Sequence, residues 1–188
     1  MDMNPKRAGF SMVELIMVML LMGILAGIAA PSLRPEKFQL DAAAVLVASS
    51  INAQQLAAVL RQHNVVLAFD TVENRLRVHY DEDNDNTIDT AENWYVIELD
   101  DNVRFSLGGA TARPLGSTPI SVTGAQDSIP ALTFRRNGSA SEESIIYITS
   151  MKSINESSGK DTRSIEIERA TGRTRCYSFS SGAWVQTC

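Results

Sequence analysis

A single acidic residue, Glu14, lies within an otherwise apolar run of 24 residues from Phe10 to Leu33. A charge in the middle of a hydrocarbon segment costs about 3 kcal/mol on membrane-insertion scales. A carboxylate in such a place is therefore expected to serve a partner. The alternative is an acid without a partner that is protonated or extends toward the membrane surface.

The second group of chemically active residues is the twelve-residue acidic run from Asp81 to Glu92. Its oxygen-bearing side chains and one backbone carbonyl match the spacing of an EF-hand calcium loop. The predicted ligands are Asp81, Asp83, Asp85, Thr87 (through its carbonyl), Asp89 and Glu92. The sixth loop position, usually glycine, is Asn86, which also tolerates a left-handed backbone. We expect a structural Ca²⁺ in a loop between two strands, with a solvated acidic turn as the alternative.

Cysteine and histidine are rare in this chain. The two cysteines, Cys176 and Cys188, are expected to form one disulfide in an exported protein, and a reduced pair is the alternative. His63 follows a predicted helix end, and His79 is expected on the polar side of a strand. Neither histidine stands in a nucleophile or zinc motif, and no Walker-type phosphate loop is present, so we expect no enzymatic activity.

The apolar run from Phe10 to Leu33 is the element that must position Glu14. As a helix it would be about 36 Å long, which is enough to cross a bilayer. Because Lys6 and Arg7 precede it, the N-terminus is expected to stay in the cytoplasm and the remainder to be exported. A secretory signal cut near residues 27–29 is one alternative, although the run is long for it. A plain membrane anchor is another, but it leaves Glu14 unexplained.

The helix is predicted to continue to about Gln62, with a bend near Pro31 and Pro35. Two apolar stripes at helical spacing follow nearly opposite sides of the segment. The first stripe contains Leu40, Ala44, Val47, Ile51 and Ala58, and the second contains Phe38, Ala42, Val45, Leu56 and Leu60. We expect one stripe to pack on the chain's own sheet and the other on neighbouring subunits. The alternative is a helix buried within one domain.

Beyond residue 62 the sequence pattern changes from helix to strand. Strands are predicted at 65–69, 76–80, 94–99, 103–107, 131–136, 144–150, 163–169 and 174–179. A loop is predicted at 108–130, a polar hairpin tip at 154–162 and a turn at 170–172. The predicted fold class is α+β, with a long N-terminal helix packed on an antiparallel β-sheet domain.

The segment Gly9-Phe10-Ser11-Met12-Val13-Glu14-Leu15 closely resembles the class III (prepilin) signal of type IV pilins. The resemblance implies that a prepilin peptidase cuts between Gly9 and Phe10, that the new N-terminal Phe10 is methylated, and that Glu14 acts in filament assembly. After cleavage the Phe10 amino group is a cation at the end of an apolar helix. Glu14 of a neighbouring subunit could neutralise it, which removes two uncompensated charges from lipid.

The same resemblance implies the organisation of the chain and its location. The expected parts are a leader at 1–9, a transmembrane assembly helix at 10–33, its amphipathic continuation at 34–62 and a β-rich pilin domain at 63–188. The protein would cross the inner membrane once before assembly and belong to a periplasmic or extracellular filament afterwards. Expected partners are other pilin or pseudopilin subunits, the prepilin peptidase, the inner-membrane assembly platform and the membrane itself.

More specifically, the chain is similar to minor pseudopilin H (GspH) of type II secretion and to the FimT and FimU minor pilins, through its N-terminal helix and the turns at 134–138 and 170–175. Minor subunits of this kind prime or cap filament assembly. Some FimT proteins bind DNA through a Gly-Arg-x-Arg element, which Gly172, Arg173 and Arg175 match. The mature chain has 15 basic and 21 acidic residues, and this net charge of −6 argues against DNA binding. A solvated strand edge and a membrane-anchored adhesive domain are the alternatives.

Overall fold

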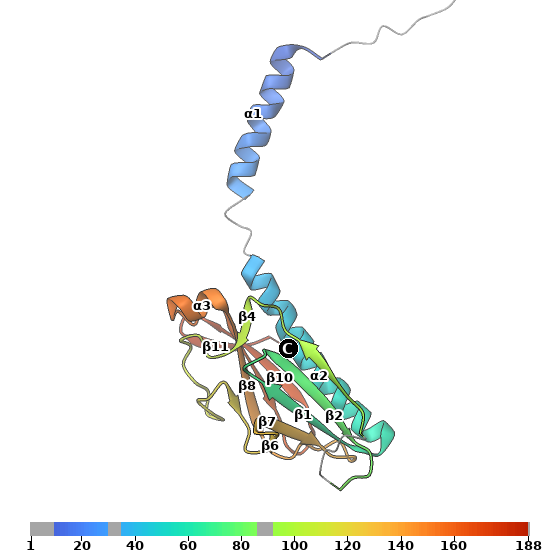
Figure 1. Ribbon diagram of the computed structural model, residues 1–188. Helices are drawn as coiled ribbons and strands as arrows, with labels where there is room; N and C mark the ends of the chain where they lie inside the picture. The colour runs from blue at the N-terminus through green and yellow to red at the C-terminus, as the bar shows by residue number, and fades with distance from the viewer. Residues whose placement is uncertain (1–9, 30–34, 86–91, 188) are drawn as a thin grey trace, which may run out of the picture. The chain divides into compact units, whose positions relative to one another are not determined.

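The computed structural model describes residues 10–29, 35–85 and 92–187. It divides the chain into two compact units, residues 1–35 and residues 36–188, which are drawn in Figure 1. The first unit contains an apolar helix, and the second contains a longer helix and antiparallel sheets. The predicted α+β class is therefore confirmed.

Helix α1, Met12–Ala29, is the element of the first unit. Ser11 precedes it, and the Ser11 Oγ accepts a hydrogen bond from the Val13 N–H at 3.3 Å, as a helix-capping residue does. The large apolar side chains described on α1 are 47–83% exposed. Within the described part of its own unit, this helix therefore has nothing that covers its apolar surface.

Helix α2, Pro35–Arg61, begins at a proline. Proline suits the first helical position because its fixed φ fits the helix and its missing N–H would have no partner there. Because the residues between α1 and α2, Pro31 among them, lie outside the described part of the chain, the expected bend near Pro31 and Pro35 stays a prediction.

The two apolar stripes of α2 have opposite environments. Every residue of the first stripe, from Leu40 to Ala58, is at most 8% exposed. In the second stripe Ala42 is exposed, and the larger side chains of Phe38, Val45, Leu56 and Leu60 are 57–73% exposed. The prediction that one face packs on the chain's own sheets is confirmed. The alternative of a helix buried on all sides is wrong.

The strands form two antiparallel sheets. One sheet has the order β3-β2-β1-β7-β6, and the other has the order β11-β10-β9-β8-β4, with β5 also paired to β8. The first contains β1 (Asn64–Asp70), β2 (Arg75–Asp81), β3 (Trp94–Glu98), β6 (Ala125–Gln126) and β7 (Ile129–Phe134). The second contains β4 (Val103–Phe105), β5 (Ile120–Ser121), β8 (Ser144–Ser150), β9 (Thr162–Ile167), β10 (Thr174–Ser180) and β11 (Ala183–Gln186).

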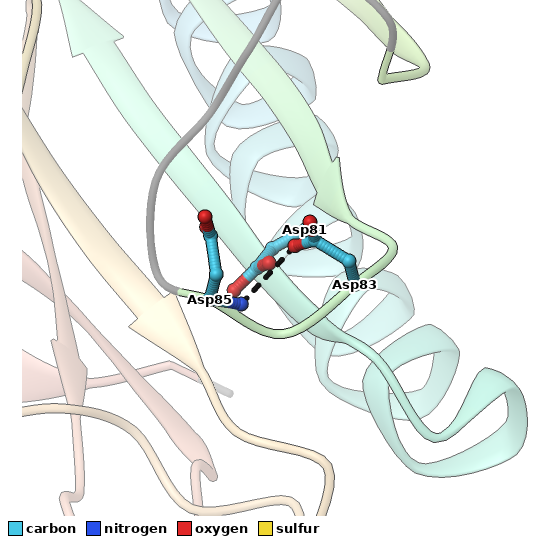
Figure 2. Close-up of side chains that lie close together, drawn as sticks. All are labelled: Asp81, Asp83 and Asp85. Atoms are coloured by element: carbon cyan, nitrogen blue, oxygen red, sulfur yellow. Dashed lines mark hydrogen bonds between the residues drawn. The ribbon is translucent and has the colours of Figure 1, made fainter.

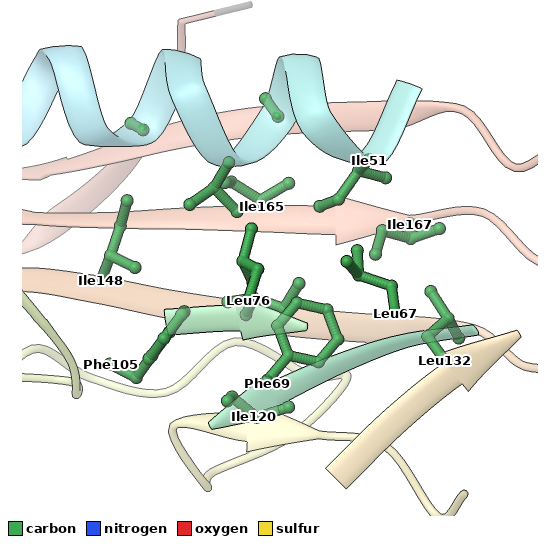
Figure 3. Packing of buried hydrophobic residues seen from close by; sticks show 14 of the residues in the cluster. Ile51, Leu67, Phe69, Leu76, Phe105, Ile120, Leu132, Ile148, Ile165 and Ile167 are labelled. Atoms are coloured by element: carbon green, nitrogen blue, oxygen red, sulfur yellow. The ribbon is translucent and has the colours of Figure 1, made fainter. Parts of the chain in front are cut away.

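The hydrophobic core joins α2 to both sheets (Figure 3). Ile51 of α2, Leu67 of β1 and Ile165 of β9 are all fully buried in this cluster. Phe69 and Phe105 meet edge to face, with ring centroids 6.2 Å apart, and so connect β1 with β4. Because alternate residues of β1, β8 and β9 belong to this core, the strand periodicity and the observed packing agree in these strands.

Four short elements depart from the sequence prediction. The expected polar hairpin tip at 154–162 overlaps helix α3, Met151–Glu156, whose first turn is capped by Ser150: its Oγ accepts the Ser153 N–H at 3.1 Å. Strand β11 is paired with β10 but was not predicted. The expected loop at 108–130 contains the two-residue strands β5 and β6, which are too short to give a periodic pattern.

Candidate functional site

The N-terminal segment presents an acid at the start of an exposed apolar helix. Glu14 lies in the first turn of α1, where the exposed N–H groups of the helix end favour negative charge. Phe10, which is also exposed, lies just before the helix. Gly9 and the rest of the predicted leader lie outside the described residues. The described part therefore offers a carboxylate that a cationic group of another chain can approach.

The acidic loop brings three predicted ligands together. Carboxylate oxygens of Asp81, Asp83 and Asp85 all lie within 4.8 Å of one another (Figure 2). Asp81 is buried at the end of β2, whereas the other two are exposed. The Asp85 N–H donates to the Asp83 Oδ1 at 3.1 Å, which holds the turn in shape. Three carboxylates this close repel one another unless a cation or protons intervene.

The far end of the same loop is connected to its beginning. The Glu92 Oε1 accepts the Glu82 N–H at 2.8 Å, and the Asn93 Nδ2 donates to the Glu82 Oε1 at 2.6 Å. Of the remaining predicted ligands, Thr87 and Asp89 lie outside the described residues, as does Asn86. The predicted placement between two strands is confirmed, because β2 and β3 pair on either side of the loop.

One residue of this loop has a left-handed backbone that was not predicted from the sequence. Asn84, at the fourth loop position, has φ of +61°. Its Oδ1 accepts the Asn64 N–H at 2.9 Å, and its Nδ2 lies 3.4 Å from the Gln62 carbonyl. The loop is therefore attached to the junction between α2 and β1. Asparagine tolerates a positive φ, and this tolerance could have indicated the conformation of Asn84. It does not distinguish Asn84 from any other asparagine in a loop.

The two arginine-containing turns, 134–138 and 170–175, lie side by side, which the sequence did not predict. The Gln55 side-chain amide of α2 donates to the carbonyls of both Gly138 and Thr171. A Cβ on Gly172 would lie 2.5 Å from the Gly138 carbonyl oxygen, so only glycine fits there. Arg173 and Arg175 are exposed residues of the second turn, and the Arg175 guanidinium is 3.9 Å from the Glu168 carboxylate.

Of the two cysteines of the predicted disulfide, the structure describes Cys176. Cys176 is a buried residue of β10, and no free cysteine occurs among the described residues. The Thr187 N–H donates to the Cys176 carbonyl at 2.8 Å, so the residue before Cys188 lies next to Cys176. Cys188 itself lies outside the described residues. The pairing of Cys176 with Cys188 therefore stays a prediction.

His79 is buried, although its place in the alternation of β2 predicts a polar face. It is 8% exposed and stacks on Trp94 of β3 with ring centroids 5.9 Å apart. Neither ring nitrogen has a hydrogen-bond partner among the described residues. Burial lowers the pKa of His79 below its ordinary value of 6.5, and the Arg77 charge adds to this effect while Asp127 opposes it.

We expect acidification to destabilise the protein through His79. Because its folded-state pKa is depressed, the unfolded chain takes up a proton first as the pH falls below about 6.5. Stability should therefore decrease between pH 6.5 and the lower folded-state pKa, and His79 adds no such cost above pH 6.5. Thermal unfolding of the wild type and of His79→Phe, which retains a ring against Trp94, should be compared from pH 7.5 to 5. Equal pH dependence of the two proteins would contradict this expectation.

Comparison with known proteins identifies one segment of the chain. Residues 4–30 match the family model described as "Prokaryotic N-terminal methylation motif". The matched stretch includes Gly9, Phe10 and Glu14 and the whole of α1. Searches of the curated proteins and of the solved structures each returned no significant match.

Proposed function

We propose that this chain, a type IV pilin-like protein by its N-terminal methylation motif, is a minor pilin or pseudopilin that primes or caps assembly of a type IV pilus or a type II secretion pseudopilus. The observation that carries the proposal is the position of Glu14. The only acid of α1 lies in the first turn of an exposed apolar helix, inside the matched motif. Its function would then be mechanical rather than enzymatic.

The exposed faces of both helices support a role as a filament subunit. Among the described residues of its own unit nothing covers the apolar surface of α1, and the second stripe of α2 is exposed beside a completed core. Exposed apolar surfaces of this extent mark contacts with lipid or with other proteins. We assign α1 to the filament interior, α2's exposed stripe to contacts with neighbouring subunits, and the strand unit to the outside.

The membrane anchor before assembly is assigned to α1. By length and composition α2 also qualifies as a membrane span, whereas the described apolar part of α1, Met12–Gly27, is shorter. However, 44% of the most apolar window of α2 is buried in the protein's own core. Helix α1 has 18 residues and a length of about 27 Å, close to the ~30 Å hydrocarbon thickness. The proposed topology is a single pass of the inner membrane with the N-terminus in the cytoplasm.

Maturation is the direct test of this function. Intact mass spectrometry of the membrane-extracted protein should show loss of residues 1–9 and a gain of about 14 Da for one methyl group on Phe10. The Gly9→Leu variant is the matched control, because it changes the residue before the cut and should keep its leader. A wild-type protein that retains residues 1–9 would instead be a membrane-anchored domain, such as an adhesin.

We further propose that the acidic loop holds a structural Ca²⁺ through Asp81, Asp83, Asp85, Thr87, Asp89 and Glu92. The three clustered carboxylates support this assignment. Extracellular calcium sites bind at about 10⁻⁴–10⁻³ M. At 10 mM Ca²⁺ such a site would stabilise the fold by about 1.4–2.7 kcal/mol.

Thermal unfolding in detergent should therefore show a higher melting temperature in 10 mM CaCl₂ than in EGTA. The Asp83→Ala/Asp85→Ala variant should lose this difference, because it removes two ligands that are exposed and outside the core. Asp101→Asn, an exposed acid in another turn, should keep it. An unchanged wild-type melting temperature, together with no calcium-binding heat in calorimetry, would exclude the site.

DNA capture is the second candidate function. The observation that favours it is the contact between the two arginine turns, which places the exposed Arg136 and Arg173 at the same end of the strand unit. Several phosphate contacts together give measurable affinity where one does not. A gel-mobility shift with the full-length protein and its Arg173→Ala/Arg175→Ala variant tests this function. Equal mobility of DNA with and without the wild type would exclude it.

A further inference from the structure

A polar pocket separates the acidic loop from the turn that follows β7. Its volume is 280 Å³, and it is lined by Asn64, Asn84, Arg135, Arg136 and Asn137. All five side chains carry N–H donors and none carries a carboxylate. The pocket therefore differs in character from the acidic loop beside it, although Asn84 belongs to both.

The asparagines of this pocket are oriented by bonds within the protein. The Asn137 Oδ1 accepts the Ser139 N–H at 3.0 Å and the Ser139 hydroxyl at 2.7 Å. The Asn84 Oδ1 accepts the Asn64 N–H. Because both acceptor oxygens are engaged, Asn137 retains its amide N–H donors for a ligand. Asn84 retains only the amide N–H that does not donate to the Gln62 carbonyl.

The turn that carries the two arginines is held in a fixed shape. The Gly138 N–H donates to the Arg135 carbonyl at 2.7 Å, and the Arg135 N–H donates to the Ser139 carbonyl at 2.8 Å. The Gln55 amide of α2 fixes the Gly138 carbonyl as well. The backbone that carries the two arginines therefore needs no further ordering when a ligand binds, which lowers the cost of binding.

The guanidinium groups themselves remain exposed. None of the ion pairs among the described residues involves Arg135 or Arg136. Arg135 is exposed, and its Nη1 donates to the Ala140 carbonyl at 3.4 Å. Guanidinium groups bind carboxylate, sulfate and phosphate in a bidentate manner, more strongly than neutral donors do.

We propose that this pocket binds an oxyanion group, with Arg136 as its main charged contact and the amides of Asn84 and Asn137 as neutral donors. The ligand chemistry is that of a carboxylate or a sulfate. Its source would be either free inorganic sulfate or the acidic group of a sugar. The nearby carboxylates of Asp81, Asp83 and Asp85 oppose such a ligand. A cation in the loop offsets this repulsion, so oxyanion affinity should rise with Ca²⁺, and this dependence rests on the calcium site proposed above.

The test is a titration of the full-length protein in detergent micelles with sodium sulfate and, separately, with galacturonate. Each titration is followed by NMR shifts of the side-chain N–H groups and is carried out in EGTA and in 10 mM CaCl₂. Saturable shifts of the pocket's side-chain signals are expected. Arg136→Gln should weaken binding at least about tenfold, and Lys152→Gln, an exposed cation of α3, should leave it unchanged.

The outcomes identify the ligand of the pocket and distinguish a failure of this proposal from a failure of the calcium proposal. Binding of sulfate and galacturonate with equal affinity identifies a site for small anions, and tighter binding of galacturonate identifies acidic sugars as its source. Binding that depends on Arg136 but not on calcium supports the pocket and removes only its coupling to the loop. Absence of saturation under both conditions, or equal affinity of the wild type and Arg136→Gln, overturns the proposal.

Discussion

Glu14→Ala protein is expected to accumulate in the membrane and to be absent from filaments. In the proposed assembly step the Glu14 carboxylate neutralises the Phe10 amino group of another subunit in a low-dielectric environment. Removing one partner of such a pair leaves an unpaired charge, which costs about 3–5 kcal/mol. Since 1.4 kcal/mol is a tenfold change in an equilibrium constant, filament incorporation should fall by more than about a hundredfold.

The measurement is the fraction of this protein in sheared filaments relative to the membrane fraction, by immunoblot. Glu14→Asp retains the charge on a shorter side chain and should restore part of the incorporation. Glu36→Ala removes an acid from the first turn of α2 instead and should incorporate normally. If Glu14→Ala protein enters filaments as well as the wild type does, the proposed role of this residue is wrong.

Gly172→Ala should destabilise the strand unit far more than Gly182→Ala. Both glycines have positive φ, +67° and +82°, which costs an alanine about 1–2 kcal/mol. At Gly182 a Cβ meets nothing within 4 Å, whereas at Gly172 it would lie 2.5 Å from the Gly138 carbonyl oxygen and 2.9 Å from the Gln55 amide nitrogen. Overpacking adds about 1–3 kcal/mol, so the total loss at Gly172 should be about 2–5 kcal/mol.

Thermal unfolding of the two variants, followed by circular dichroism in detergent, measures this difference. The pair is matched because the same substitution is made at two positive-φ glycines, and only one of them touches another turn. The Gln55→Ala variant should lose part of the same stability, since it removes the amide that joins the two turns. Similar melting temperatures for Gly172→Ala and Gly182→Ala would show that the contact between the turns contributes little.

The local patterns of the sequence were sufficient for most elements of the fold. Strands β1, β2, β8 and β10 lie where alternation or continuous apolar residues predicted them. The stripe of α2 that contains Leu40 and Ile51 was identified from helical spacing alone, and it is buried. These predictions succeed because a residue's burial on a helix or strand follows from its phase within that element.

Local patterns failed where a short element or a remote contact decided the structure. Helix α3 depends on the Ser150 cap and on packing beside β8, and β11 exists because β10 offers it a pairing edge. His79 shares the phase of the polar residues of β2, but its position against Trp94 on the neighbouring strand buries it. The burial of a strand residue depends on the residues of the neighbouring strands. The alternation along one strand does not determine which residues these are.

The sequence by itself determined the N-terminal signal, because its features are local in the chain: a glycine before Phe10, an apolar run and one acid at Glu14. It also placed the acidic loop between two strands. Only the tertiary structure decided that the strands form two sheets, and that the turns at 134–138 and 170–175 meet beneath Gln55. The same is true of the pocket beside Asn84, which joins residues from distant segments. Contacts of this kind are fixed by the packing of the whole core, since the chain brings those segments together only when it folds.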